Sequence, residues 1–249
     1  MFFSLLACLP DLNGPVVLAT GLGQPRSISL SAQDQLLVAS HDGLYAVDYY
    51  GAVTPEPGLV GLELQQVVAH DDRLYVLDAA GRIGWRMVAS QSWSWVALTE
   101  KPKALMAWSK HRLILVYDDS LELWSPEHPA PEAWRSGFSS ILDTAYDTES
   151  GCGGVILATT EGLVRSCDGG FETISSLVLD QVSSSQNQIW GLQKGQLGLV
   201  AGERLQESRS FPATDMVFGA STLFPSHLLY GVMDKTLELT QCLPEKLAD

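Results

Sequence analysis

The sequence predicts an all-β protein, a six-bladed β-propeller of four-stranded antiparallel blades. A polar residue followed by a short apolar run recurs about every 38 residues, a period typical of one propeller blade. Within each period the apolar runs are short and are separated by Gly- and Asp-containing turns, as expected for antiparallel hairpins. The last period lacks a fourth strand, and an unassigned apolar run at residues 15–20 is available to complete it.

The first three blades are predicted over residues 24–60, 61–100 and 101–138. Each contains runs rich in Val, Leu, Ile or Tyr that suit half-buried strands. The Pro-rich stretch 127–134 interrupts the third blade and is predicted to be a loop before its last strand. In chain order the predicted strands are 27–32, 35–40, 44–50, 52–60, 64–70, 71–78, 79–88, 92–99, 104–109, 112–118, 119–125 and 132–138.

The remaining blades are predicted over residues 139–177, 178–211 and 212–249. Only three strands are found in the last of them, and residues 15–20 are expected to lie outside 235–241 as the fourth. Such pairing closes the ring and covers an exposed strand edge. In chain order these strands are 143–148, 154–160, 161–166, 171–177, 180–185, 187–193, 196–202, 204–211, 214–220, 227–234 and 235–241. Residues 15–249 are therefore expected to form one domain, preceded by a segment at 1–14.

Composition limits the partners. The chain has 249 residues, 15 basic against 29 acidic residues and a net charge of −14. An acidic protein repels phosphate backbones, so nucleic-acid binding is not expected. No apolar run reaches the ~20 residues that a transmembrane helix needs. Cations, basic proteins or small polar molecules remain the natural ligands.

The N-terminus leaves two interpretations open. Leu5-Leu6-Ala7-Cys8 resembles the bacterial lipobox, which implies a lipid anchor at Cys8 and export to the cell envelope, although no Lys or Arg precedes it. The alternative is an apolar segment that packs on the propeller of a cytoplasmic protein. The cysteines give no zinc signature; Cys152–Cys167 and Cys8–Cys242 are each expected to lie close enough for a disulfide if the protein is exported.

One local motif supports the fold. Ser166, Asp168, Gly169 and Gly170 resemble the Asp-box of sialidase-like (BNR-like) propellers, S-x-D-G-G-x-T-W, with Thr173 one position late and Ile174 in place of Trp. In that family the box forms the turn between the third and fourth strands of a blade, which is where the predicted strands place it. The resemblance implies a structural turn in which the carboxylate accepts backbone N–H groups.

The residues that open the inner strands are the main candidate site. Inner strands of a propeller start around one mouth of the central channel, so these residues are expected to form a ring. Three neighbouring carboxylates in it, Asp143, Asp180 and Asp215, suit a hard cation such as Ca²⁺. Alternatively the ring is only a polar lining of a water-filled channel. The full predicted ring is Arg26, Gln65, Lys103, Asp143, Asp180 and Asp215.

Trp93 and Trp95 alternate on a predicted outer strand, so both side chains point to the same face. Exposed, they would form a surface for a partner or a sugar; otherwise they pack between blades.

The sequence thus favours a non-enzymatic propeller that binds a protein or small polar ligand at the channel mouth and requires no cofactor. The alternative is a metal-dependent hydrolase or lactonase with a divalent cation on the three aspartates. Six-bladed gluconolactonase-like hydrolases hold a metal at this mouth, and the chain resembles them in blade number only. No Ser elbow, phosphate-binding loop or dinucleotide motif occurs.

Overall fold

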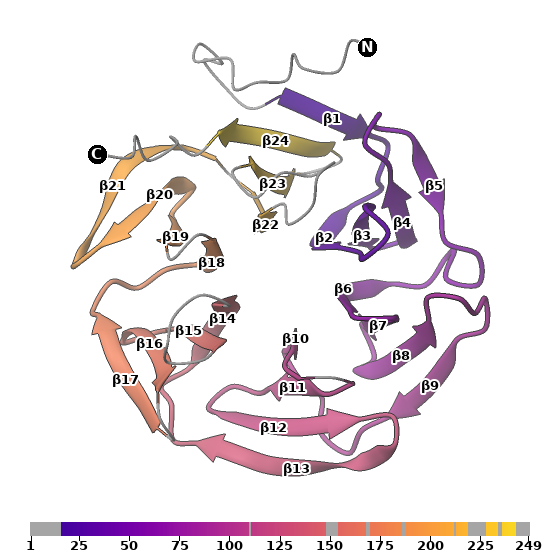
Figure 1. Ribbon diagram of the computed structural model, residues 1–249, viewed down its shortest axis with the longest axis horizontal. Coiled ribbons are helices and arrows are strands. Elements are labelled where there is room, and N and C mark those ends of the chain that lie inside the picture. Colours follow the sequence, from indigo (N-terminus) through magenta and orange to yellow (C-terminus); the bar gives the residue numbers. More distant parts are fainter. Residues whose placement is uncertain are drawn as a thin grey trace.

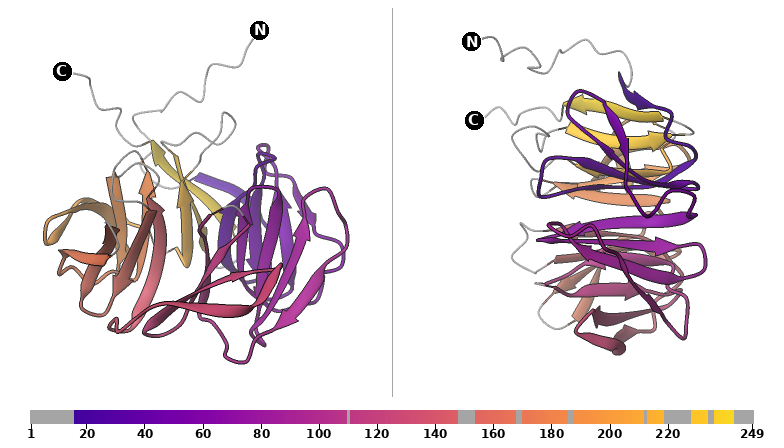
Figure 2. Two further views of the ribbon diagram at one scale, coloured as in Figure 1. Left: turned by 60° about the horizontal axis from the view of Figure 1, so that its bottom comes forward. Right: turned by 90° about the vertical axis from the view of Figure 1, so that its right-hand side faces the viewer.

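The structure is a computed structural model that describes residues 16–109, 111–147, 154–167, 170–185, 188–211, 213–218, 228–233 and 236–242. These residues form six four-stranded sheets arranged around a centre (Figure 1). Figure 2 shows the sheets edge-on, standing side by side around that centre. The predicted six-bladed propeller is therefore confirmed.

The first three blades follow the predicted divisions of the chain. Their strands pair in chain order, from the innermost to the outermost. They are β2 (Pro25–Leu30), β3 (Leu36–Ser40), β4 (Gly43–Val47), β5 (Val53–Pro55), β6 (Leu64–His70), β7 (Arg73–Asp78), β8 (Arg82–Met87), β9 (Ser94–Ala97), β10 (Ala104–Ala107), β11 (Leu113–Val116), β12 (Ser120–Ser125) and β13 (His128–Ser136).

The other three blades also match, and the last contains strands from both ends of the chain. Its order is β1-β24-β23-β22. The strands are β14 (Ile141–Asp147), β15 (Gly154–Thr159), β16 (Gly162–Cys167), β17 (Gly170–Ser175), β18 (Gln181–Ser185), β19 (Gln188–Gln193), β20 (Gln196–Ala201), β21 (Arg204–Ser210), β22 (Asp215–Phe218), β23 (Leu228–Met233), β24 (Thr236–Cys242) and β1 (Val16–Thr20).

Strand β1 closes the ring as predicted. It pairs antiparallel with β24, from Val16 opposite Leu239 to Thr20 opposite Thr236. Ala19 is buried in a cluster that joins blade 6 to blade 1 and includes Val38. Closure therefore combines backbone pairing with apolar burial, and it covers an edge of β24 that would otherwise be open.

The predicted loop at 127–134 is wrong in part, because β13 already starts at His128. Proline lacks an N–H and disfavours the interior of a sheet, but the outermost strand of a blade needs no partner on its outer side. Pro129 and Pro131 are therefore tolerated in β13, at the cost of an irregular register against β12.

The hydrophobic core lies between blades rather than at the centre. Buried clusters combine strands of neighbouring sheets, for example Tyr75 and Leu77 of blade 2 with Leu113 and Leu115 of blade 3. The channel side is left to the innermost strands. Among the residues that the structure describes, no helix is long and apolar enough to cross a bilayer.

Candidate functional site

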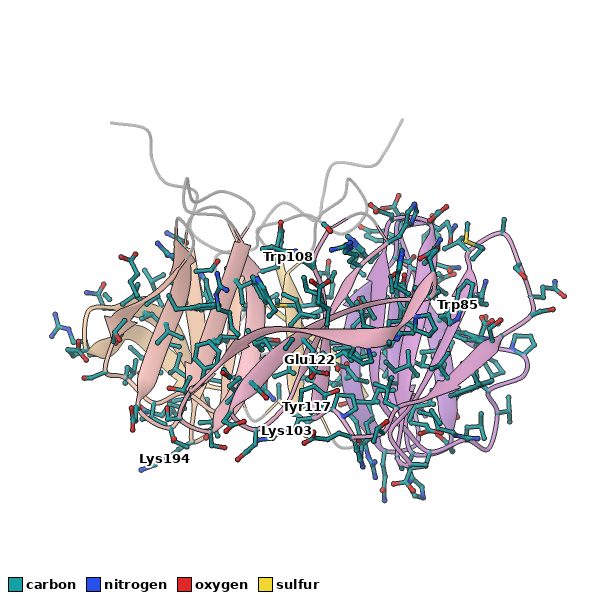
Figure 3. The ribbon with its side chains drawn as sticks, turned by 90° about the horizontal axis from the view of Figure 1, so that it is seen from below. Trp85, Lys103, Trp108, Tyr117, Glu122 and Lys194 are labelled. Atoms are coloured by element: carbon teal, nitrogen blue, oxygen red, sulfur yellow. The ribbon has the colours of Figure 1, made fainter. Side chains whose placement is uncertain are left out.

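The candidate site lies where the innermost strands begin. Strands β2, β6, β10, β14, β18 and β22 lie nearest the centre of the ring. Lys103, just before β10, lies at one face of the disc, and Trp108, just after β10, lies at the opposite face; Lys194 also lies at the Lys103 face (Figure 3). The mouth at this face is where the sequence places its ring of polar residues.

Strand register identifies the equivalent residue in each blade. In every blade one inner-strand residue pairs with a second-strand residue that in turn pairs with a buried Leu or Ile of the third strand. We call these inner-strand residues the inner layer. They are Ser27, Gln66, Ala104, Asp143, Gln181 and Asp215.

The residue before each of these belongs to the outer layer, closer to the mouth. In blades 1, 2 and 4 the outer-layer residue is an extra residue at an irregularity of the register. Such a bulge re-aims a side chain and is common near sites at strand ends. The outer layer consists of Arg26, Gln65, Lys103, Leu142, Asp180 and Thr214.

The ring predicted from the sequence therefore mixes the two layers. Arg26, Gln65, Lys103 and Asp180 belong to the outer layer, whereas Asp143 and Asp215 belong to the inner layer. The repeat length varies between blades, so the periodicity leaves an uncertainty of one residue that only the pairing of strands resolves.

The inner layer joins neighbouring blades through hydrogen bonds from backbone N–H groups. Leu105 N donates to Gln66 Oε1 (2.5 Å) and Val67 N lies 3.4 Å from Ser27 Oγ. Val182 N donates to Asp143 Oδ2 at 2.7 Å, and Ile28 N donates to Asp215 Oδ2 at 2.8 Å. These bonds fix blades 1–2, 2–3, 4–5 and 6–1 to one another.

The other two junctions use donors from side chains. Gln181 Nε2 donates to the backbone oxygen of Thr214, between blades 5 and 6. Between blades 3 and 4, where the inner layer has Ala104, the outer-layer Lys103 Nζ donates to Ile141 O at 2.9 Å. A side chain near the mouth thus bridges every pair of adjacent blades.

Asp143 and Asp215 are half-buried residues whose carboxylates accept backbone hydrogen bonds from the next blade. Burial raises the pKa of Asp143 to about 8, repulsion from Asp215 acts in the same direction, and the Val182 and Thr144 N–H groups oppose it. Burial also raises the pKa of Asp215 to about 6, against hydrogen bonds from Ile28 and Met216 N–H and from the Ser27 hydroxyl. The two acids therefore disfavour each other's negative charge.

The three aspartates predicted to bind a cation do not form one set of ligands. Asp180 Oδ2 accepts a hydrogen bond from Lys194 N at 2.6 Å, within its own blade. Asp143 and Asp215 face the backbone of neighbouring blades. Among the described residues, no group of three or more His, Cys, Asp or Glu side chains is arranged to hold a metal ion. The residues present thus do not fit the Ca²⁺ site suggested by their spacing.

The outer layer carries exposed ion pairs. Arg26 Nη2 lies 2.7 Å from Glu63 Oε1, and His41 Nδ1 lies 3.3 Å from the same oxygen. The hydrogen bond from Arg26 lowers the pKa of Glu63. On the third blade, Lys103 Nζ lies 2.7 Å from Asp118 Oδ1, and its hydrogen bond lowers the pKa of that carboxyl.

The rest of the outer layer differs in chemistry. Leu142 is 41% exposed although it is apolar, and Asp180 and Thr214 are exposed. Thr214 Oγ1 donates to Val232 O at 3.0 Å. Around the mouth the outer layer therefore presents, in order, a positive, an amide, a positive, an apolar, a negative and a hydroxyl group.

The segment that resembles an Asp-box spans the connection between β16 and β17, and the Asp-box itself stays a prediction. Strands β16 and β17 are the third and fourth strands of blade 4, and Cys167 pairs with Gly170 across the connection. Ser166 is buried, and its Oγ accepts a hydrogen bond from Val155 N at 3.2 Å. Asp168 and Gly169 lie outside the described residues, as do Cys8 and Cys152, so the lipobox and the predicted disulfides also fall there.

Trp93 and Trp95 pack against the core between blades 1 and 2. The Arg86 guanidinium carbon lies 5.4 Å from the ring centre of Trp93, and that of Arg82 lies 5.1 Å from Trp95. A Cβ at Gly84 would approach the Trp95 ring to 2.9 Å, so glycine makes room for this indole. Both side chains are half-buried and serve packing between blades.

Ser27, Gln66 and Gln181 are the inner-layer residues with polar side chains that sequence reasoning missed. Each lies directly after a residue of the predicted ring and has a polar side chain. The signal available was the paired Gln65-Gln66, in which both neighbours fit the period equally well.

Comparison with known proteins gives the fold. No protein-family model matches the sequence, and no curated protein matches it. A gluconolactonase from Xanthomonas campestris superposes with a TM-score of 0.70 at 10% identity, covering 96% of this chain and 92% of that one. The fold is shared. YCF48 from Cyanidioschyzon merolae gives a TM-score of 0.62 at 13% identity, covering 94% of this chain and 99% of that one.

A structure of YCF48 bound to D1 peptide also matches, with a TM-score of 0.62, 12% identity and coverage of 96% and 98% of the two chains. At these identities the comparisons establish the six-bladed propeller alone.

Proposed function

We propose that this chain is a non-enzymatic recognition protein that binds a polar ligand or protein segment at the channel mouth. The observation that carries the proposal is the division between the two layers. Inner-layer side chains are engaged with the backbone of neighbouring blades, whereas the outer layer presents exposed and chemically varied groups on a rigid ring. Rigid scaffolds with variable rim residues suit recognition.

Charge indicates the kind of ligand. The chain carries a net charge of −14, and Arg26 and Lys103 are each paired with a carboxylate at the mouth. Exposed acidic groups at that face, such as Asp180, favour a basic or zwitterionic partner. YCF48, a propeller of similar extent, has been captured with a peptide, and this precedent supports a peptide segment as the ligand class.

Site-specific photo-crosslinking tests the location. A photoreactive residue at Gln65 or Leu142 is expected to crosslink the partner in an extract of the source organism, whereas one at Gln206, exposed on β21, is not. The variant Asp180→Lys places a positive charge against a basic partner and is expected to lose the mouth crosslink, and Glu172→Lys on the outermost strand β17 is expected to keep it. Crosslinking at Gln206 alone would place the interface on the rim and contradict the proposal.

A lactonase is the second candidate, favoured by the likeness to a gluconolactonase and by the two half-buried inner-layer acids, Asp143 and Asp215. Turnover of gluconolactone with added Ca²⁺ or Zn²⁺, abolished by Asp143→Asn but kept in Asp180→Asn, would establish the enzyme. Absence of turnover together with an unchanged melting temperature on adding either ion would eliminate it.

A further inference from the structure

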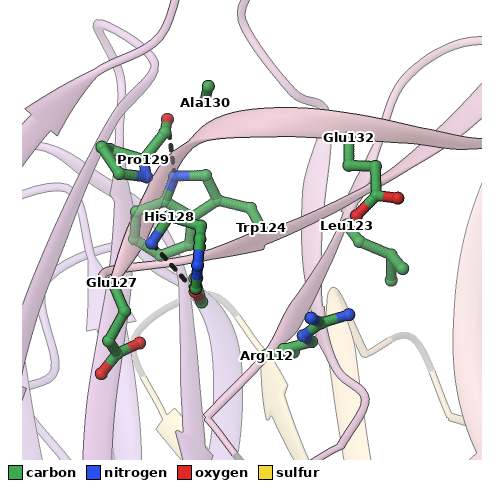
Figure 4. A pocket seen from close by; sticks show the side chains of 9 residues that line it. Arg112, Leu123, Trp124, Glu127, His128, Pro129, Ala130 and Glu132 are labelled. Atoms are coloured by element: carbon green, nitrogen blue, oxygen red, sulfur yellow. Dashed lines mark hydrogen bonds between the residues drawn. The ribbon is translucent and has the colours of Figure 1, made fainter.

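A second candidate binding site lies on blade 3, away from the channel mouth. The ladder between β12 and β13 pairs Leu123 with Glu132 and Ser125 with His128. Between these two pairs, residues 129–131 of β13 face a single residue of β12, Trp124. Pro129 and Pro131 lack an N–H group, so they cannot donate to the ladder. Strand β13 bows away there and leaves a groove of about 420 Å³ (Figure 4), within the ~300–1,000 Å³ typical of small-molecule sites.

The groove is held in shape by its own residues. Trp124 is buried, and its Nε1 donates to Pro129 O at 3.2 Å. His128 N donates to Ser125 Oγ at 3.2 Å at the start of the bowed segment. These two bonds, drawn in Figure 4, fix both sides of the groove. The site is therefore preformed, which lowers the entropy lost on binding.

One of the charged groups that line the groove is already engaged. Glu127 lies 2.5 Å from Nη2 of the buried Arg73, and this hydrogen bond lowers the pKa of Glu127 to about 2. Arg73 also lies over the Trp85 ring, with its guanidinium carbon 5.4 Å from the centroid. Glu127 is thus a permanent anion directed toward Arg73, and it is not available to a ligand.

The other charged groups are available. Within the described part of the chain, the Arg112 guanidinium and the Glu132 carboxylate have no ion pair or side-chain hydrogen bond, either with each other or with a third residue. Figure 4 shows them at the same end of the groove, with Leu123 beside them, and Pro129 and Trp124 at the other end. A cation and an anion, without ion pairs in the described part of the chain, thus lie at one end of an apolar surface.

This combination discriminates between ligand classes. Glu127 and Glu132 repel a phosphate or a dianion, and Arg112 disfavours a simple cation. Trp124 is only 2% exposed, so no aromatic face is open for stacking on a sugar. A molecule with one carboxylate, one ammonium group and an apolar body matches Arg112, Glu132 and the apolar surface beside them.

We propose that the blade 3 groove binds a zwitterion the size of a dipeptide. Arg112 binds its carboxylate, Glu132 binds its ammonium group, and Leu123 and Pro129 contact its apolar side chain. This site is separate from the channel mouth and does not depend on the function proposed for that mouth.

Isothermal titration with leucyl-leucine tests the proposal, with N-acetyl-leucyl-leucine and leucyl-leucinamide as ligands that lack one charge each. Saturable binding is expected with leucyl-leucine, and blocking either end is expected to weaken it at least ~10-fold, as for loss of a charge-assisted hydrogen bond. Arg112→Gln should weaken leucyl-leucine to the same extent and make binding insensitive to amidation. Glu132→Gln should likewise weaken the binding of leucyl-leucine and make binding insensitive to N-acetylation of the dipeptide.

The matched control is Arg135→Gln. Arg135 lies on β13, as Glu132 does, but outside the lining of the groove, so this variant should bind the dipeptide as the wild type does. Ala130→Trp fills the groove without changing charge and should abolish binding. No saturable heat up to ~10 mM dipeptide, or equal binding by Arg112→Gln and the wild type, would overturn the proposal.

Discussion

Gln65 and Gln66 are identical side chains in adjacent positions, yet they belong to different layers of the channel mouth. Gln66 Oε1 accepts a hydrogen bond from Leu105 N of the next blade. Gln65 occupies the extra position of a bulge at the start of β6. Position relative to the bulge, and not residue type, therefore decides whether a mouth residue bridges two blades or lies in the outer layer.

The same contrast holds around the ring. Four inner-layer side chains accept hydrogen bonds from backbone N–H groups of the next blade, and an unsatisfied buried donor is costly. In the outer layer, Arg26 and Lys103 form ion pairs with exposed partners, and such pairs contribute little to stability. The inner layer is therefore expected to determine stability and its pH dependence, and the outer layer to determine recognition.

The largest effect is expected from Asp143→Asn. The pKa of Asp143 is raised in the folded state to about 8, so its contribution to stability is present at low pH and is lost as pH rises through about 8. The pKa of Asp215 is raised to about 6, so Asp215 adds a further loss of stability as pH rises through about 6. The wild-type melting temperature should therefore fall between pH 5 and pH 8.5. Asparagine keeps an acceptor for Val182 N without charge, so the variant should melt several degrees higher than wild type at pH 8.5.

Asp180→Asn is the matched control, because Asp180 is exposed in the outer layer and its acceptor for Lys194 N is also kept. Its pH profile of melting temperature should follow the wild type. If Asp143→Asn and Asp180→Asn gave the same profile, the inner layer would not be the source of the pH dependence.

The next effect separates the two glutamines. Gln66→Ala leaves Leu105 N without its acceptor and should lower the free energy of unfolding by about 1–3 kcal/mol. Gln65→Ala removes a side chain from the outer layer and should change it by no more than about 0.5 kcal/mol. Denaturant unfolding of both variants measures the difference. Equal losses would show that the division into layers has no energetic meaning.

Much of the fold was predictable because its signals are local. Short apolar runs, Gly and Asp turns and a recurring spacing gave the six blades, and the missing fourth strand of the last blade pointed to Val16–Thr20. The outer strand β13 was missed at its start because prolines argue against a strand, although an edge strand tolerates them.

The candidate site was less predictable, because its definition depends on single-residue irregularities. The bulge at Leu142 moves Asp143 into the inner layer, and sequence spacing does not distinguish the two positions. The engagement of Asp143 with Val182 N, 39 positions away, follows only from the packing of blades. The charges were visible in the sequence, but their partners were not.

The smallest effect tests the boundary between the layers. Lys103 belongs to the outer layer and pairs with Asp118, yet its Nζ also donates to Ile141 O across a blade junction. The side chains of Lys103 and Asp118 are 44% and 70% exposed, so a double-mutant cycle with Lys103→Met and Asp118→Asn should give a coupling energy of about 0.2–1 kcal/mol. Because exposed pairs are screened, the coupling should shrink at 1 M salt. A coupling above about 2 kcal/mol that persists in salt would assign Lys103 to the stabilising layer, since its hydrogen bond to Ile141 O would then supply at blade 3 the link between blades that Ala104 cannot make.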